Sequence, residues 1–208
     1  QLHTLLTEQR HPKTWNLSER LQKDPADGLR MLFSVDEDIS RRLETLTEGG
    51  PALESLVSAV EQAILAKKTI YIYGCGATGR LAKQMESAFW RPFWRKVKLL
   101  PCWEKLRHHL PADIEENLTG EMTGADRAMV SSLEGFEDLQ LIGRLQLKDR
   151  GVTRGDVVIC VTEGGETSSV IGTVLGALDQ YGEAAAERTR ESQRNLYFVY
   201  NNPDEVLR

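Results

Sequence analysis

The feature that most constrains the fold of this chain is a short apolar run followed at once by a glycine-rich turn. Residues 69–73 read TIYIY and residues 74–80 read GCGATGR. The run is short, β-branched and aromatic, which predicts a strand. The apolar spacing after residue 80 predicts a helix. Strand, glycine turn and helix in this order are the opening of a βαβ unit.

The same order recurs further along the chain. DVVICV at 156–161 predicts a second strand, followed by the turn TEGGETSS and a helix, and LYFVY at 196–200 predicts a third strand. Residues 136–150 predict a helix between them. For one further strand, residues 97–100 and residues 117–123 remain alternatives. Short apolar strands separated by helices favour an α/β fold with a doubly wound parallel sheet that helices cover on both faces.

The first fifty residues predict a helical appendage. Apolar spacing predicts one helix over residues 24–47 and another over residues 51–67. Gly49, Gly50 and Pro51 separate them, since proline suits the first turn of a helix. We therefore predict a helical segment at 1–50 and an α/β domain at 51–208.

Composition excludes several classes of function. The 26 Lys and Arg against 31 Asp and Glu give a net charge of −5, which argues against a nucleic-acid binder. No apolar run approaches the roughly 20 residues that span a membrane, and no secretory leader is visible. Cys75, Cys102 and Cys160 are too widely spaced for a disulfide framework or a structural zinc site. These features predict a cytoplasmic protein.

The two glycine turns predict a site for an anionic ligand. In an open parallel sheet, ligands bind beyond the carboxyl ends of the strands, where helix N-termini offer unpaired N–H groups to phosphate. Gly74, Gly76 and Gly79 match the dinucleotide spacing, but no convincing acidic residue follows about 20 positions later. A tight turn without a ligand is the alternative for either loop.

Six motifs, taken in order, resemble a known family. They are TEQRHP at 7–12 with SVDEDI at 34–39, YGCGATGRL at 73–81, MTGADRAMVSSLEGFED at 122–138, DVVICVTEGGET at 156–167 and YNNP at 200–203. Together they resemble sugar isomerase (SIS) domains, particularly those of N-acetylmuramic acid 6-phosphate etherases and glucokinase regulatory proteins. The resemblance spans nearly the whole chain, apart from an apparent insertion at 90–118.

The resemblance implies a five-stranded parallel SIS sheet, a bound amino-sugar 6-phosphate and a homodimer. It implies lyase activity without a metal or organic cofactor, in which one glutamate removes the C2 proton and another protonates the departing lactate. Glu137 aligns with the glutamate that acts as the base in the family, and Glu134 is expected to shape the sugar site. The ligand-binding positions implied are Gly76, Thr78, Gly79 and Arg80 in the first loop and Thr162, Gly164, Thr167 and Ser168 in the second.

The sequence departs from the etherase pattern at four positions, one of which is Ala77, where a hydroxyl residue of the first loop is expected. Ala88 stands where the second catalytic glutamate is expected, and Glu86, two residues earlier, points about 200° away on a helix. In the second loop, Gly164 replaces a serine and Glu166 replaces an arginine. The family also continues beyond YNNP, so we expect a C-terminally truncated domain. A lyase, a non-catalytic sugar-phosphate sensor and an SIS scaffold without a ligand remain alternatives.

The aromatic and basic residues at 89–98 leave two interpretations open. The segment FWRPFWRKVK could form a surface for a partner or a stacking platform. Alternatively, it is a helix with buried aromatic rings and solvated cationic side chains, since such side chains often cover apolar surface.

Overall fold

The computed structural model describes residues 5–131 and 133–207. Two compact units make up the chain, Gln1–Ser55 (unit 1) and Leu56–Arg208 (unit 2). The boundary predicted from sequence, between residues 50 and 51, stays a prediction. The two units are described in turn.

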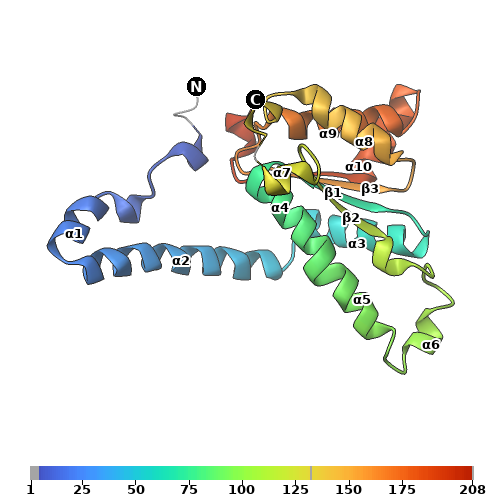
Figure 1. The fold of residues 1–208 in the computed structure, drawn as a ribbon, viewed down its shortest axis with the longest axis horizontal. Helices are drawn as coiled ribbons and strands as arrows, with labels where there is room; N and C mark the ends of the chain where they lie inside the picture. The colour runs from blue at the N-terminus through green and yellow to red at the C-terminus, as the bar shows by residue number, and fades with distance from the viewer. Residues whose placement is uncertain (1–4, 132, 208) are drawn as a thin grey trace. The chain divides into compact units, whose positions relative to one another are not determined.

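Unit 1 is built on one long helix. It contains the short 3₁₀ turns η2 (Leu6–Glu8) and η3 (Pro12–Thr14), then α1 (Leu17–Lys23) and α2 (Pro25–Thr47) (Figure 1). Asp24 caps α2 by accepting a hydrogen bond of 2.9 Å from the Ala26 N–H. At Gly28 the helix lies so close to α1 that a Cβ would come within 2.5 Å of the Leu21 side chain. The helix predicted over 24–47 is confirmed.

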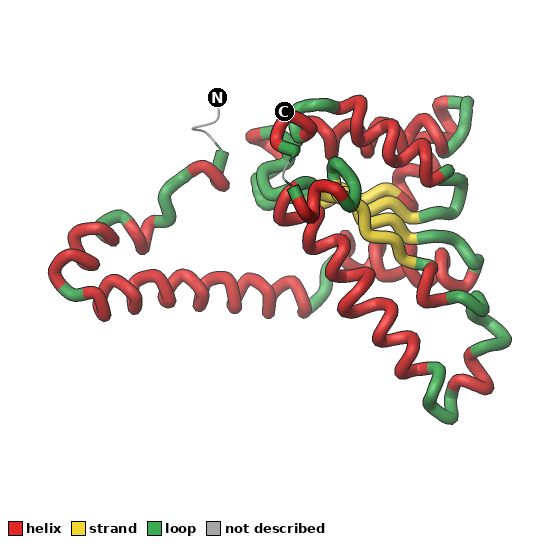
Figure 2. Tube along the Cα trace, viewed as in Figure 1, coloured by secondary structure: helices red, strands yellow, loops and turns green. Residues whose placement is uncertain are grey.

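Unit 2 contains a parallel sheet of four strands in the order β2-β1-β3-β4 (Figures 1 and 2). The strands are β1 (Ile70–Gly74), β2 (Leu118–Met122), β3 (Val157–Val161) and β4 (Leu196–Val199). The three predicted strands are confirmed. Of the two alternatives for a further strand, the one within residues 117–123 is correct. The described residues form four strands, whereas the family resemblance implies five.

Helices cover both faces of this sheet. Ile70 and Ile72 of β1 belong to an apolar cluster with Ala63 of α3 (Pro51–Leu65) and Ala82 of α4 (Gly76–Gln84). The alternate residue Tyr73 belongs to the opposite cluster, with residues of α8 (Gln140–Arg150) and α9 (Ser168–Gln180). This alternation of side chains is what a strand buried on both faces requires. The doubly wound α/β class is confirmed.

The remaining elements of unit 2 are short helices and turns. They are η4, a π-helix (Met85–Trp90), α5 (Arg91–Val97), α6 (Trp103–Leu106), η5 (Ile114–Glu116), α7 (Arg127–Val130), η6 (Glu134–Phe136), α10 (Ala185–Asn195) and η7 (Asp204–Val206). The helix predicted over 136–150 begins only at Gln140. Phe136 lies instead in the 3₁₀ turn that precedes it.

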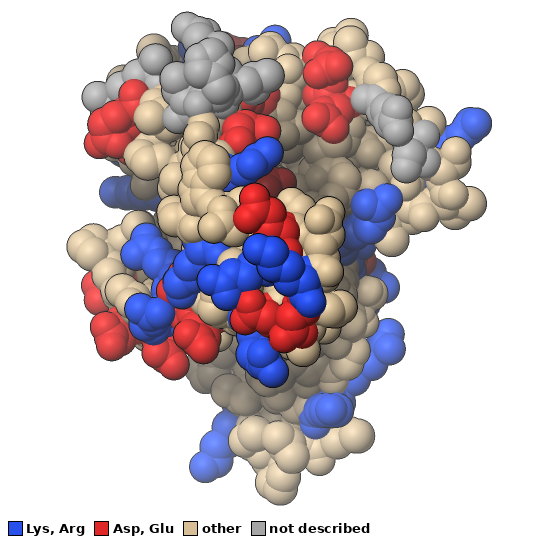
Figure 3. Space-filling view, turned by 90° about the vertical axis from the view of Figure 1, so that its left-hand side faces the viewer, with Lys and Arg blue, Asp and Glu red and all other residues tan. Residues whose placement is uncertain are grey.

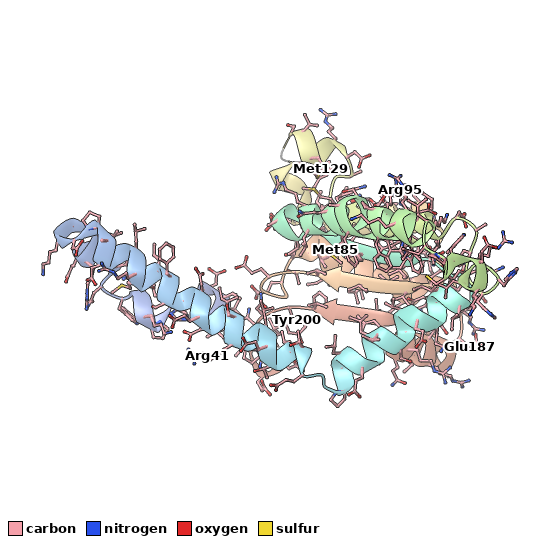
Figure 4. The ribbon with its side chains drawn as sticks, turned by 90° about the horizontal axis from the view of Figure 1, so that it is seen from below. Arg41, Met85, Arg95, Met129, Glu187 and Tyr200 are labelled. Carbon is pink, nitrogen blue, oxygen red and sulfur yellow. The ribbon has the colours of Figure 1, made fainter. Side chains whose placement is uncertain are left out.

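The aromatic and basic segment is helical, and its rings divide between interior and surface. Trp90 is buried, and its indole N–H donates to the Ile114 carbonyl at 2.8 Å. Phe89 and Phe93 are exposed and stack with ring centroids 5.9 Å apart. Arg95 points away from the sheet and Met85 points toward it (Figure 4). The interpretation as a helix with buried aromatic rings is therefore correct for Trp90 and wrong for the phenylalanines.

Two surface properties bear on possible partners: the apolarity of the helices and the distribution of charged side chains on the face shown in Figure 3. Within residues 5–131 and 133–207, no helix combines the length and apolarity needed to cross a membrane. On the face shown in Figure 3, Lys and Arg side chains are interspersed with Asp and Glu side chains. This mixture agrees with the small net charge of −5.

Candidate functional site

The strand order places both glycine turns at one edge of the sheet. From β1 the chain crosses to β2 on one side and then to β3 on the other, so the direction of winding reverses between β1 and β3. In open α/β sheets, ligands bind outside the carboxyl ends of the strands at such a reversal. The first loop, residues 74–80, follows β1, and the second loop, residues 162–169, follows β3.

Two first-loop residues assigned to ligand binding serve the packing of the loop. The Thr78 hydroxyl accepts from the Cys75 N–H at 3.1 Å and donates to the Cys75 carbonyl at 2.9 Å. Gly79 is buried, and a Cβ there would lie 2.6 Å from the Met122 side chain. Thr78 therefore closes the turn at the start of α4, and Gly79 allows α4 to lie close to β2, while the ligand-binding role of both stays a prediction. Gly76, by contrast, has a φ of +55°, and the space where its side chain would stand is open. Because no side chain is present there, a ligand can approach the backbone of Gly76 closely.

A cavity of about 130 Å³ opens at the first loop. Gly76 and Arg80 line it from α4, and Glu137 lines it from the connection between β2 and α8. The other lining residues are Cys75, Met122, Thr123, Ala128 and Leu133. The structure thus brings three of the predicted site residues into one hollow, with a guanidinium and a carboxylate at the N-terminus of a helix.

The segment that carries Glu137 is fixed against α9. Its backbone carbonyl accepts a hydrogen bond of 2.9 Å from the N–H of Ser169, in the first turn of that helix. The Glu137 side chain itself is exposed. Glu134 lies in the 3₁₀ turn just before it, and its side chain is outside the described part of the structure.

The second loop is folded onto itself and onto the turn after β4. The hydroxyls of Thr162 and Thr167 lie 2.9 Å apart. The Gly164 carbonyl accepts from the Asn202 side-chain amide at 2.8 Å. Ser168 is half-buried at the start of α9. None of these residues is among those that line the cavity in the described part of the chain, and their binding role stays a prediction.

The glutamates of the second loop do not face the cavity. Glu163 and Glu166 are exposed, and neither is among its lining residues. Arg80 supplies the positive charge among the lining residues.

A chain of buried hydroxyls, not singled out by the sequence analysis, lies at the cavity. Thr123 lines it and is 4% exposed. Its hydroxyl donates to the Tyr73 phenol at 3.1 Å and lies 2.9 Å from the Ser169 hydroxyl. The Tyr73 phenol donates to Gln146 at 3.0 Å, and burial raises the pKa of Tyr73 to about 12. These bonds join β1, β2, α8 and α9 beneath the cavity.

Gln146 completes this arrangement. Its amide nitrogen donates to the Met122 carbonyl at 2.9 Å, and its oxygen accepts from the Gly124 N–H at 3.1 Å. The connection carrying Glu137 is thus held at its start by Gln146 and at its end by Ser169. Thr123 could have been found from sequence: it follows the stretch LTGEM, and a strand there places the next residue at the ligand-binding edge.

We predict that Thr123→Val lowers the free energy of unfolding by about 1–3 kcal/mol, because it leaves the buried Ser169 and Tyr73 hydroxyls short of a partner. Urea denaturation measures the change. Thr123→Ser keeps the hydroxyl and is the matched control, expected to lose clearly less. A Thr123→Val variant as stable as the unsubstituted chain would contradict this role of the hydroxyl.

Position 88 is where the family resemblance implies a second catalytic glutamate. Ala88 lies exposed in the π-helix η4 and does not line the cavity. The Glu86 carboxylate accepts from the Gly120 N–H at 2.8 Å and pairs with Arg91 at 2.8 Å. Glu86 is therefore engaged by β2 and by Arg91, and it is not among the residues that line the cavity. Among the described residues that line the cavity, Glu137 alone carries a carboxylate.

Comparison with known proteins finds N-acetylmuramic acid 6-phosphate etherases among the relatives of the chain. No protein-family model matches the chain. Two curated N-acetylmuramic acid 6-phosphate etherases are from Lactococcus lactis: that of subsp. cremoris strain MG1363 is 28% identical over 187 residues and that of subsp. lactis strain IL1403 is 29% identical over 195 residues. The etherase of Synechococcus sp. strain CC9605 is 27% identical over 168 residues.

These matches cover 90%, 94% and 81% of this chain, respectively, but 54%, 56% and 46% of the relatives. The chain thus spans about half the length of the curated relatives it matches. Over most of its own length, the chain is similar to the N-acetylmuramic acid 6-phosphate etherases, the family that its motifs indicate.

Proposed function

We propose that this chain binds an amino-sugar 6-phosphate at the first loop, with Glu137 as a base toward the sugar C2 proton. The observation that carries this proposal is that Glu137 shares one cavity with Gly76 and Arg80. A helix N-terminus and a guanidinium attract a phosphate. A carboxylate in the same hollow is the group that proton removal needs.

The chemistry is the first half of an ether elimination. A base takes the C2 proton, the electron pair forms the C2–C3 double bond, and the C3–O bond to lactate breaks as its oxygen gains a proton. The lining residues supply one carboxylate for the first transfer, and Ala88 removes the acid expected for the second. We therefore propose that C2 proton exchange is retained and that ether cleavage is slow.

A non-catalytic sugar-phosphate sensor is the second candidate. It is favoured by two observations, Ala88 in place of a glutamate and Glu86 held by Gly120 and Arg91.

The homodimer that the resemblance implies remains part of the proposal. The free thiols of Cys75, Cys102 and Cys160 support a reducing compartment such as the cytoplasm.

Incubation of the chain with N-acetylmuramic acid 6-phosphate in deuterated water tests the proposal. We expect a rise in melting temperature, because a ligand that binds the folded state stabilises it, and loss of the C2 proton signal by NMR, with little lactate released. Binding without exchange would favour the sensor. The absence of both the melting shift and the exchange would overturn the proposal. N-acetylmuramic acid without phosphate is the control for the anion site.

A further inference from the structure

A second cavity, of about 510 Å³, lies in the segment that joins α5 to β2. Its volume falls within the roughly 300–1,000 Å³ that is usual for small-molecule sites. The segment belongs to the apparent insertion at 90–118, which the family resemblance does not cover. The lining residues are Lys98, Trp103, Arg107, His108 and Ala112.

This cavity and the first-loop cavity lie at opposite ends of the sheet. Ala112 precedes β2, whereas Met122, which lines the first-loop cavity, is the last residue of β2. Figure 1 accordingly shows α6 near one end of the strands and α7 near the other. The two cavities share no lining residue. The second cavity is therefore a separate site, and a ligand there is independent of the proposed sugar site.

The walls of the second cavity are tied to one another by Lys98. Its ammonium donates to the Ala112 carbonyl at 3.0 Å and pairs with the Glu115 carboxylate. The same ammonium lies 5.5 Å from the centroid of the Trp103 ring, within the range of a cation–π contact. These contacts join the end of α5, the start of α6 and the segment before β2. A wall that is fixed before a ligand arrives costs less free energy to order on binding.

Arg107 and His108 supply hydrogen-bond donors for a ligand. The Arg107 Nε lies 3.2 Å from the Glu104 carboxylate, and among the described residues the two terminal nitrogens of Arg107 have no partner. His108 is exposed and has no partner within the same part of the chain. A guanidinium suits phosphate, because two parallel N–H groups match two phosphate oxygens. We therefore expect an anionic group at Arg107.

The surrounding segment concentrates positive charge in an otherwise acidic chain. Residues 91–109 hold six Lys and Arg against one Glu, a charge of +5 in a chain whose net charge is −5. Acidic residues that follow are partly neutralised, since Glu115 pairs with Lys98 and Glu116 pairs with Arg91. Such a local excess of positive charge attracts anions. Three further exposed cations form no ion pair among the described residues: Arg95, Lys96 and Lys105.

We propose that this cavity binds a nucleoside phosphate, with the phosphates at Arg107 and the base against Trp103. The Trp103 ring is half-buried beside the apolar core and presents part of its surface to the cavity. Nucleobases stack on aromatic side chains, since every base has a π-face. A phosphate alone would occupy the cations and leave the indole uncovered. An indole and a guanidinium in one hollow therefore favour a ligand that has both parts.

Calorimetric titration of the chain with three probes tests the proposal. ATP carries a base and phosphates, tripolyphosphate carries the charge alone, and adenosine carries the base alone. Divalent cations are removed, so that the phosphates meet Arg107 directly. We expect ATP to bind at least about tenfold more tightly than either other probe, because only ATP makes both contacts. No binding of ATP at millimolar concentration, or equally tight binding of tripolyphosphate or adenosine, would overturn the proposal.

Arg107→Gln should weaken ATP binding about tenfold or more, because a charge-assisted hydrogen bond to phosphate is lost. Lys105→Gln is the matched control: it removes one positive charge two residues away, from an exposed side chain that does not line the cavity. It should change ATP binding by no more than about twofold. Both positions are exposed, so circular dichroism should show an unchanged fold. Equal weakening in the two variants would indicate unspecific attraction and overturn the proposal.

Two more variants locate the ligand. Trp103→Leu should bring the affinity for ATP down to that for tripolyphosphate, and an unchanged affinity for ATP would contradict the contact with the base. Arg80→Gln alters the first-loop cavity and should leave ATP binding unchanged. Loss of ATP binding in Arg80→Gln would place ATP at the first loop and overturn the proposal.

Discussion

Replacing Glu137 by glutamine should lower the rate of C2 hydrogen exchange in a bound amino-sugar 6-phosphate by about 10²–10⁴-fold, the usual contribution of a general base. The amide keeps the size of the side chain but cannot accept the proton. The phosphate contacts proposed for Gly76 and Arg80 are untouched. The ligand-induced rise in melting temperature should therefore persist, and NMR in deuterated water measures the exchange.

Glu166→Gln is the matched control for this experiment. Glu166 is an exposed carboxylate on the neighbouring loop and does not line the cavity. Its substitution should leave exchange within about twofold of the unsubstituted chain. If Glu137→Gln exchanged at the full rate, Glu137 would not be the base. If both variants lost exchange equally, a general loss of negative charge would explain the effect better than proton transfer.

Gly143→Ala should destabilise unit 2 by about 1–3 kcal/mol or more, the range for overpacking a close contact. Gly143 lies where α8 meets α9, and a Cβ there would stand 1.9 Å from the Ser169 carbonyl. This neighbour is backbone, so the helices must separate. The higher helix propensity of alanine, about 1 kcal/mol over glycine, offsets only part of this loss. Urea denaturation measures the change.

The same variant should also disturb the site, because the Ser169 N–H holds the Glu137 carbonyl. Gly135→Ala is the control: nothing lies within 4 Å of a Cβ there, and its φ lies outside the positive range. It should change stability by no more than about 0.5 kcal/mol. Equal stability of the two variants would contradict the close packing of α8 on α9.

Strands buried on both faces could be predicted because their own residues carry the signal. In TIYIY and DVVICV every position is apolar or aromatic, apart from the ends, and glycine turns follow. The edge strand β2 reads LTGEM and lacks that pattern. It forms because Gly120 lets the Ala82 carbonyl of α4 approach, and because the buried Glu121 pairs with Arg150. Neither partner is near in sequence.

The sequence by itself determined the α/β class, the two glycine loops and, through its motifs, the likeness to the etherases. Only the tertiary structure decided which of the predicted site residues meet: Gly76, Arg80 and Glu137 line one cavity, whereas Thr78 and Gly79 are not among its described lining residues. The physical reason is that strand and helix signals are local. A site is assembled by hydrogen bonds and close contacts between distant segments, such as those of Thr123 and Ser169.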